Sequence, residues 1–366
     1  LDQAREFGRM VSWKAAERYA EWRCEAEPER LRVGMVSGDY SNHPVGYFLE
    51  GLLAAMDPER IELIAYTTGS RSDDLTERIR PHFAGWKSLV GLNDKAAAQL
   101  IHDDGIHVLL DLAGHTAMNR LPVFAWKPAP VQASWLGYFA TTGVAEMDYL
   151  LADEVGVPEA RRGDFTERVW YLPDTRLCFT PPAYELAVSP LPALVKGHVT
   201  FGCFQRLDKV NDAVLAVWGR ILGALPDSRL RWQCKWFGDA TVKAGLSERL
   251  RQHGIDPARV ELVGPAPRRD YLAAHAEVDM TLDTFPYTGG TTTCEALWMG
   301  VPTVTLAGGT LLARQGASLL TAAGLDDWVA ESEDEYVAKA LGFAADLESL
   351  SRLRAELRER VLASPV

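Results

Sequence analysis

The stretch TGGTTTCEALWMG, residues 288–300, places glycines, threonines and a glutamate at the start of an apolar run. The first turn of a helix has free N–H groups and a partial positive charge, so small and hydroxyl-bearing residues there suit phosphate binding. Thr291 and Glu295 are four residues apart and share one helix face. The carboxylate disfavours phosphate but can accept hydrogen bonds from ribose hydroxyls. The alternative is a capped helix with a buried face and an idle glutamate.

Two other groups of residues have types suited to acid–base or anion chemistry. Asp39 and His43 follow an apolar run, and histidine titrates near neutral pH, as a general acid or base requires. Asp39 could orient His43, relay a proton or only cap the next helix, and His43 could be a loop histidine bonded to the backbone. Arg206 and Lys209 precede a helix start, which suits a departing diphosphate whose charge grows. The alternative for this pair is ordinary surface charge.

Alternating strand and helix patterns position these residues and predict parallel sheets covered on both faces. Helices are predicted over 1–30, from Pro44, near 72–80, over 93–105, from Asn211 and over the last fifty residues. Strands are predicted over 31–39, 61–68, 106–114, 131–137, 148–153 and 169–173, and then over 199–204, 229–237, 259–264, 279–285 and 302–308.

The segment 179–198 is rich in Pro, Ala and Leu and predicts a linker between two similar halves. The predicted fold class is α/β, with two Rossmann-like domains facing across a cleft and ligands at the carboxyl ends of strands. Polar clusters that include His115, Gly137 and Gln205 follow such strand ends. The predicted segments are an N-terminal helical segment (1–30), an N-terminal lobe (31–178), the linker, a C-terminal lobe (199–310) and C-terminal helices (311–366).

The composition narrows the possible partners. The formal charge of −12 argues against nucleic acid, which needs a basic surface, but leaves room for a local nucleotide site. The five scattered cysteines form no CxxC pair, and Asp103 and Asp104 are interpreted as solvated, so no metal site is expected. No signal peptide or membrane span is apparent, and a cytoplasmic protein is the default expectation. Because the chain starts at Leu1, it is expected to be a fragment of something longer.

The segments GDYSNHPVG, DLAGHT, KPAPVQASWLGYFATTG, MDYLLAD, FQRLDKV and LDTFPYTGGTTTCEALWMGVPTVTL resemble the catalytic region of the O-linked N-acetylglucosaminyltransferases. The resemblance covers about residues 31–366, and the short linker is similar to that of the bacterial form. It implies a B-type glycosyltransferase that moves N-acetylglucosamine from UDP-GlcNAc to Ser or Thr hydroxyls of proteins. It also implies inversion, no metal and no cofactor, with UDP as product, and tetratricopeptide repeats upstream of or outside this chain.

The resemblance assigns roles to individual positions. Near the sugar and the reacting hydroxyl it places Asp39, His43, Pro44, Leu136 and Gly137; at the uridine and diphosphate it places Arg206, Lys209, Ala266, Arg268, Thr291, Thr292 and, on the ribose, Glu295. Gln205, His115 and Gly290 complete the expected substrate-binding set. In this sequence Gly290 and Tyr271 stand where animal enzymes have histidines, and Arg206 replaces a glutamine. A family histidine proposed as the base has no counterpart in residues 1–30.

Alternatives of other classes remain open at this point. Related enzymes transfer glucose or another sugar, including to asparagine, and UDP-GlcNAc epimerases share the architecture. A non-catalytic nucleotide-sugar binder is a third alternative. For the base of a transferase, His43 with Asp39 ranks first, before a phosphate oxygen of the donor or a histidine outside the chain.

Overall fold

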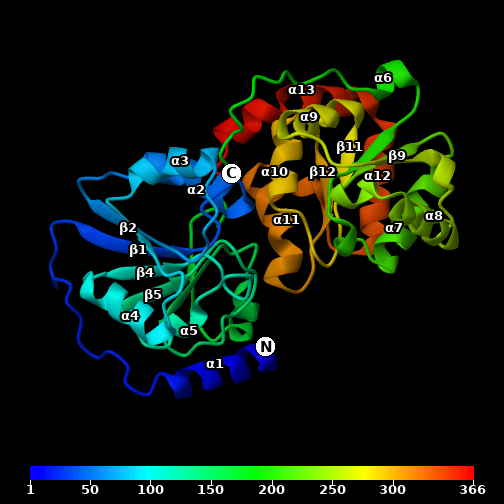
Figure 1. Ribbon diagram of the computed structural model, residues 1–366. Coiled ribbons are helices and arrows are strands. Elements are labelled where there is room, and N and C mark those ends of the chain that lie inside the picture. The colour runs from blue at the N-terminus through cyan, green and yellow to red at the C-terminus, as the bar shows by residue number, and fades with distance from the viewer. The chain divides into compact units, whose positions relative to one another are not determined.

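The computed structural model describes residues 1–366, which divide into two compact units, 1–180 and 181–366. Each unit is an α/β domain built on one sheet whose strand pairs are all parallel (Figure 1). The α/β fold with two parallel sheets is therefore confirmed. Two strands that the sequence patterns missed, β3 and β13, lie at sheet edges, where short pairing segments carry little apolar signal.

Unit 1 has seven strands in the order β3-β2-β1-β4-β5-β6-β7. The strands are β1 (Leu31–Ser37), β2 (Ile61–Thr67), β3 (Gly85–Ser88), β4 (Val108–Asp111), β5 (Val131–Ser134), β6 (Tyr149–Ala152) and β7 (Arg168–Tyr171). The α-helices are α1 (Asp2–Lys14), α2 (Pro44–Ala55), α3 (Asp74–Ile79), α4 (Asp94–Asp103) and α5 (Leu121–Phe124). Figure 1 shows α2 and α3 over one face of the sheet and α4 and α5 over the other.

Unit 2 has six strands in the order β10-β9-β8-β11-β12-β13. The strands are β8 (Thr200–Cys203), β9 (Arg229–Gln233), β10 (Val260–Val263), β11 (Met280–Leu282), β12 (Thr303–Leu306) and β13 (Val329–Ala330). The α-helices are α6 (Ala193–Lys196), α7 (Asp212–Ala224), α8 (Ala240–Gln252), α9 (Arg268–Ala273), α10 (Thr291–Trp298), α11 (Leu311–Ala322), α12 (Glu333–Ala345) and α13 (Leu347–Ala363).

Apolar spacing explains how the helices lie on the sheets. The helix that begins at Pro44 buries Val45, Phe48, Leu49 and Leu53, a set with the predicted i, i+3, i+4 spacing. In the same way α7 buries one face, from Val214 to Leu222, against the core of unit 2. These two helices each follow the first strand of a sheet, so their N-termini and the loops before them are fixed at the carboxyl ends of β1 and β8.

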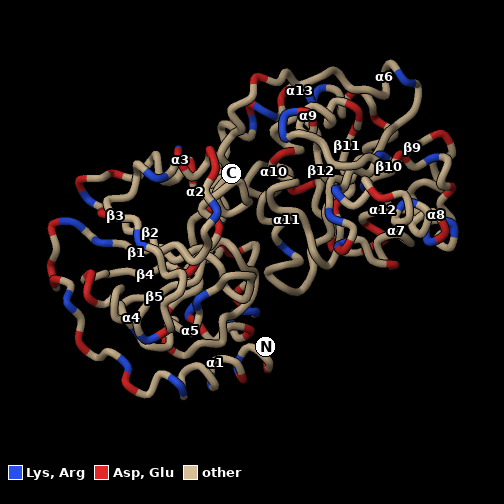
Figure 2. The backbone as a smooth tube through the Cα atoms, viewed as in Figure 1, with Lys and Arg blue, Asp and Glu red and all other residues tan.

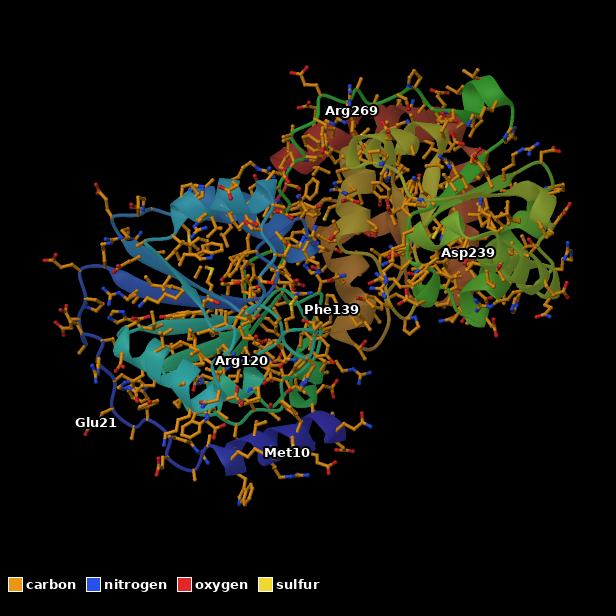
Figure 3. The ribbon with its side chains drawn as sticks, viewed as in Figure 1. Met10, Glu21, Arg120, Phe139, Asp239 and Arg269 are labelled. Carbon is orange, nitrogen blue, oxygen red and sulfur yellow. The ribbon has the colours of Figure 1, made fainter.

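The helix predicted over residues 1–30 is shorter in the structure, where α1 ends at Lys14. Tertiary contacts hold the rest of this segment in an irregular path. The Tyr19 ring stacks on His102 with 3.9 Å between ring centroids, and Trp22 Nε1 donates to the carbonyl oxygen of Lys127 over 2.9 Å. The side chain of Met10, labelled in Figure 3, lies on α1 and is 48% exposed.

The C-terminal helices and part of the linker pack into unit 2. Arg354 of α13 is buried and donates to the carbonyl oxygens of Ser189, Val278 and His275 over 2.7 to 3.2 Å. Arg358 donates in the same way to the carbonyl oxygen of Leu186. These bonds tie the segment before α6 to the last helix, so 181–198 folds with the unit that follows it.

Charged side chains of both signs are interleaved along both units (Figure 2). None of the helices has the length and apolar composition needed to cross a membrane. No group of three or more His, Cys, Asp or Glu side chains is arranged to hold a metal ion. All five cysteines are free thiols, and three of them are buried.

Candidate functional site

Asp283, at the carboxyl end of β11, organises the loop that leads into α10. Its buried carboxylate accepts hydrogen bonds from the backbone N–H groups of Gly289 (2.8 Å) and Thr284 (2.9 Å). It also accepts from Gln205 Nε2 at 3.1 Å and Thr305 Oγ1 at 2.7 Å. Burial raises the pKa of Asp283, and these donors oppose that shift. One carboxylate therefore joins the ends of β8, β11 and β12 into a fixed frame.

Lys209 lies beside this frame without a carboxylate directly on its ammonium group. Its Nζ is 3.8 Å from the centre of the Tyr287 ring and donates to the carbonyl oxygen of Thr288 at 3.2 Å. Burial lowers the pKa of Lys209 to about 8, and the nearby Asp283 limits the shift. A cation held by an aromatic face and a carbonyl keeps donors available, which is the arrangement that an incoming anion needs.

The N-terminus of α10, which the sequence predicts as a phosphate site, has no side-chain cap. This helix starts at Thr291 on Gly290 and receives no side-chain cap, whereas α7 is capped by Asn211. Its first-turn N–H groups are therefore not occupied by a cap. Thr292 Oγ1 accepts from Gln205 Nε2 over 2.7 Å, which brings two of the predicted substrate-binding residues into contact.

The two glycines before α10 allow this close packing. A Cβ at Gly289 would lie 2.4 Å from Gln205 Nε2, and one at Gly290 would lie 2.7 Å from Gln315 Nε2. Any larger residue at Gly289 would force the Gln205 amide and the hydroxyls of Thr292 and Thr293 to shift. A side chain at Gly290 would meet the amide of Gln315.

Glu295, predicted at the ribose, is buried and already engaged by two partners. Its Oε1 is 2.5 Å from Arg268 Nη1, and its Oε2 accepts from the Tyr271 hydroxyl at 3.0 Å. Burial raises the pKa of Glu295, and Arg268 opposes this. Ribose hydroxyls would have to share or replace these partners. Ala266, predicted at the uracil, is exposed in the loop between β10 and α9.

Arg206 is exposed and paired with a neighbour. Its guanidinium forms a salt bridge with Asp208 two residues on. This pairing raises the pKa of Arg206. A phosphate role for Arg206 requires that the salt bridge open, whereas Lys209 needs no such change.

In unit 1, Asp39 and His43 form the loop between β1 and α2. His43 is the N-cap of α2, and its Nδ1 accepts from the backbone N–H of Val45 at 3.3 Å. Asp39 Oδ2 is 3.7 Å from the same Nδ1. Burial lowers the pKa of His43, and Asp39 opposes the shift. In this geometry a neutral His43 carries its proton on Nε2; to accept a proton there, it must move its proton to Nδ1, toward Asp39.

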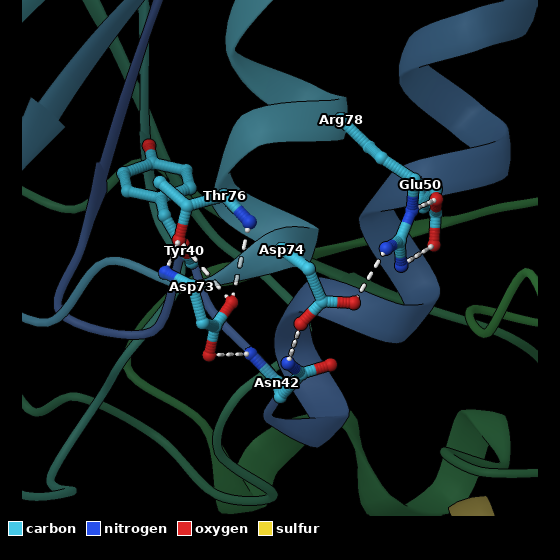
Figure 4. A network of polar contacts seen from close by, with 7 residues as sticks. All are labelled: Tyr40, Asn42, Glu50, Asp73, Asp74, Thr76 and Arg78. Carbon is cyan, nitrogen blue, oxygen red and sulfur yellow. Dashed lines mark hydrogen bonds and ion pairs between the residues drawn. The ribbon is translucent and has the colours of Figure 1, made fainter.

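A polar network holds this loop against α3 (Figure 4). The backbone N–H of Asn42 donates to Asp73 Oδ2 at 2.8 Å, and Asn42 Nδ2 donates to Asp74. Thr76 Oγ1 donates to the carbonyl oxygen of Tyr40 at 2.6 Å. Tyr40 and Asn42, which lie between Asp39 and His43, are thus anchored. Pro44 is exposed at the first turn of α2.

His115, Leu136 and Gly137 occupy adjoining loops of unit 1. His115 Nε2 donates to the carbonyl oxygen of Thr142 at 2.8 Å, which leaves Nδ1 as the acceptor of the neutral ring. Leu136 has a φ of 75°, and its carbonyl oxygen lies 3.4 Å from Arg176 Nη1. A Cβ at Gly137 would be 2.0 Å from the carbonyl oxygen of Leu112, so only glycine fits there.

Arg120, five residues after His115, has partners of its own. It donates to the carbonyl oxygens of Leu89 and Leu92 and pairs with Asp94 at 3.1 Å (labelled in Figure 3). Phe139, also labelled there, lies 5.3 Å from the Arg176 guanidinium. The loop after β5 therefore packs against Arg176 through Leu136 and Phe139.

The sequence patterns did not reveal two residues that hold the predicted site residues in place. Asp283 and Tyr287 both lie in the motif LDTFPYTGG, directly before the glycines and threonines that carry the predicted phosphate site. Asp283 could have been found as the single charged residue at the end of an apolar strand. Tyr287 had no sequence signal, because its contact with Lys209 joins residues 78 positions apart.

Two parallel Rossmann-like sheets, with a cation and an uncapped helix start at the strand ends of one, match the architecture of the two-domain glycosyltransferases. The chain belongs to glycosyl transferase family 41, whose sequence profile matches residues 10–179 and 190–366. Curated relatives include a probable UDP-N-acetylglucosamine–peptide N-acetylglucosaminyltransferase, SPINDLY, from Petunia hybrida, 42% identical over 96% of this chain and 38% of the relative. A Caenorhabditis elegans UDP-N-acetylglucosamine–peptide N-acetylglucosaminyltransferase is 25% identical over 90% of this chain and 38% of its own length. The chain thus spans about two fifths of these relatives.

Solved structures agree with this placement. A mutant O-GlcNAc transferase from Thermobaculum terrenum superimposes with a TM-score of 0.92 and 39% identity, over 98% of this chain and 68% of that one. Anabaena HepE in complex with UDP and glucose has a TM-score of 0.59 at 10% identity, over 92% of this chain and 95% of that one. The second likeness shows the fold alone. The resemblance to the O-linked N-acetylglucosaminyltransferase family is confirmed.

Proposed function

We propose that this chain transfers N-acetylglucosamine from UDP-GlcNAc to a Ser or Thr hydroxyl of a protein acceptor, with inversion and without a metal ion. The observation that carries the proposal is the arrangement at Lys209. Its ammonium has an aromatic face and a carbonyl as direct partners, beside a helix start with no cap. Family membership and the printed activities of the relatives support the same reaction.

In the proposed reaction the acceptor oxygen attacks the anomeric carbon, and the bond from that carbon to the diphosphate breaks. UDP leaves with the bonding electron pair, and its charge grows as it leaves. Lys209 and the N–H groups of Thr291 and Thr292 stabilise that charge, because preorganised donors act most strongly where charge develops. The acceptor proton goes to a base, for which His43, oriented by Asp39, is the first candidate in this chain.

Nucleotide recognition is assigned to Glu295, Arg268 and Ala266. Glu295 accepts hydrogen bonds from the ribose, with Arg268 holding its carboxylate. The loop with Ala266 contacts the base. On the sugar side, Pro44, His115, Leu136 and Gly137 line the path of the acceptor and the pyranose.

Calorimetric titration with UDP in the presence of EDTA tests the nucleotide site. Lys209→Ala should weaken UDP binding by about a hundredfold, the loss expected for a buried charge-assisted contact. The matched control is Lys235→Ala, since Lys235 is exposed and follows the carboxyl end of the neighbouring strand β9. GDP and ADP serve as controls for recognition of the base. Tight UDP binding by the Lys209→Ala variant would rule out the phosphate role.

Product analysis tests the reaction. The chain, a protein acceptor and a set of nucleotide sugars should yield acceptor glycosylation and UDP release with UDP-GlcNAc as the best donor. Preference for another sugar would replace the donor assignment. Conversion of the donor without an acceptor would indicate an epimerase, and binding without turnover would indicate a nucleotide-sugar binder.

A further inference from the structure

Unit 2 contains a polar cavity at the amino ends of its strands, whereas the proposed nucleotide site lies at their carboxyl ends. The cavity has a volume of about 490 Å³ and includes Thr200, Arg229 and Val260, the first residues of β8, β9 and β10. Lys209 and Gly289 follow the carboxyl ends of strands in the same parallel sheet. The cavity is therefore separate from the nucleotide site within unit 2.

The lining of this cavity has an excess of positive charge. Its cations are Lys196, Arg229, Arg231 and Arg259, and its carboxylates are Glu261 and Glu277. Lys196 pairs with Glu277 at 2.8 Å, and Arg231 is 3.5 Å from Glu261. Two guanidinium groups remain without a carboxylate. In a chain with a formal charge of −12, such an excess needs a cause.

Arg259 has a structural role that explains its presence. Its Nε and Nη2 donate to the carbonyl oxygens of Leu222, Leu225 and Ser228 at 2.7 to 3.0 Å, at the end of α7. Its charge nevertheless stays at the cavity. Arg229 has no such role, because it is exposed and forms none of the salt bridges or side-chain hydrogen bonds of unit 2.

Arg231 supplies the most specific signal. Its side chain is only 11% exposed, and its Nε is buried without a hydrogen-bond partner. An unpartnered buried donor on a charged group is costly, so its presence calls for a ligand or another function. Arg229 and Arg231 alternate along β9 with the buried residues Leu230 and Trp232, so both arginines lie on one face of the strand. Sheet faces in parallel α/β folds are usually apolar, which makes this polar face unusual.

We propose that this cavity binds a small phosphorylated molecule at a site distinct from the nucleotide site. Guanidinium groups match the geometry of phosphate oxygens, and that of Arg229 is exposed at the cavity without a carboxylate partner. The volume lies within the range of small-molecule sites. The chemistry fits a sugar phosphate as well as free pyrophosphate.

The test is calorimetric titration of the Lys209→Ala chain, in which binding of the probes at the proposed nucleotide site is expected to be weakened. Pyrophosphate and glucose 6-phosphate are the probes, and glucose is the uncharged control. We expect one phosphorylated molecule per chain, no binding of glucose and weaker binding as salt is raised. Binding of both probes assigns the site to phosphate groups in general, and binding of pyrophosphate alone assigns it to the inorganic anion.

Substitutions then locate the binding. Arg229→Ala, an exposed change, should weaken the anion by about tenfold or more, as expected for loss of a charge-assisted contact. Arg220→Ala is the matched control, since Arg220 pairs with Asp334 and does not line the cavity. Arg231→Gln should act in the same direction, and its melting curve reports whether the fold is kept. No binding at millimolar probe, or equal affinity in the Arg229→Ala and Arg220→Ala variants, would overturn the proposal.

Discussion

The two sheets have the same strand order except that unit 1 has the additional edge strand β7. An aspartate stands at the end of the equivalent strands β4 and β11, but its charged neighbours differ. Asp111 at the end of β4 and Asp283 just after β11 are both buried, and both accept from a glycine N–H, of Gly114 and Gly289 respectively, at 2.8 Å. Each also accepts a hydroxyl from the next strand, Ser134 in unit 1 and Thr305 in unit 2.

The difference lies in the charge that each aspartate meets. Asp283 has the cation Lys209 nearby, whereas the charged group that acts on Asp111 is the carboxylate of Glu167. Burial, with a contribution from Glu167, raises the pKa of Asp111 to about 6. The same frame thus has a cation beside it only in unit 2, where the diphosphate site is proposed. Unit 1 instead offers a neutral histidine beside a carboxylate, which suits proton transfer.

The largest expected effect separates proton transfer from nucleotide binding. His43→Ala should lower kcat by roughly 10²- to 10⁴-fold, the usual contribution of a general base. The affinity for UDP should stay unchanged, since UDP is assigned to unit 2. Because the pKa of His43 is lowered, wild-type turnover should decline only below pH 6.5, where the ring takes up a proton. A variant that loses UDP affinity but keeps kcat would remove His43 as the base.

The second prediction compares the two aspartates directly. Asp283→Asn should weaken UDP binding by about a hundredfold, because an amide cannot accept from all the groups around it and Lys209 loses a nearby negative charge. The pKa of Lys209, about 8, should fall further. As the pH is raised, the UDP affinity of this variant should therefore begin to decline at a lower pH than that of wild type.

The matched control is Asp111→Asn, which makes the same change in the equivalent frame. It should alter the melting temperature and leave UDP affinity within about twofold of wild type. Titration of both variants from pH 6 to 9 provides the measurement. Equal losses in the two variants would mean that the aspartates act through folding alone.

The third prediction concerns acid stability in unit 2. His275 is buried, stacks on Phe204, and has its pKa lowered from 6.5 to about 3 by burial. Between these values the unfolded chain binds a proton that the folded chain does not, so stability falls as pH falls. At pH 5 the loss is about 2 kcal/mol, at about 1.4 kcal/mol per pH unit. His275→Phe keeps the stacking and should remove this part of the pH dependence in denaturant titrations.

Much of the fold was predictable, and the reason is the strength of its periodic patterns. The helices that start at Pro44 and Asn211 follow apolar spacing that only a helix satisfies. The edge strands β3 and β13 were missed, because they are short and only partly buried. The end of α1 was missed because Tyr19 and Trp22 are held by partners about a hundred residues away along the chain. That separation is larger than any local pattern reaches.

The candidate site was predictable where chemistry is carried by local motifs, as at Gly290 to Glu295 and at Asp39 with His43. The partners of those residues were not. Arg268 and Tyr271 reach Glu295 across 27 and 24 positions, and neither contact leaves a pattern in one sequence. The pairing of Arg206 with Asp208 is local, but a sequence alone does not show whether two neighbouring charges meet.

The smallest expected effect tests how Lys209 is held, a feature with no equivalent in unit 1. The Tyr287 ring lies 3.8 Å from Nζ, and a cation–π contact of this kind contributes about 0.5–2 kcal/mol. Tyr287→Leu should therefore weaken UDP binding by a few fold and lower the pKa of Lys209, whereas Tyr287→Phe, which keeps the ring, should match wild type. Calorimetry at pH 7 and 9 separates the two. If Tyr287→Phe were as weak as Tyr287→Leu, the hydroxyl rather than the ring face would support the ammonium, and the contrast between the units would rest on Asp283 and the start of α10.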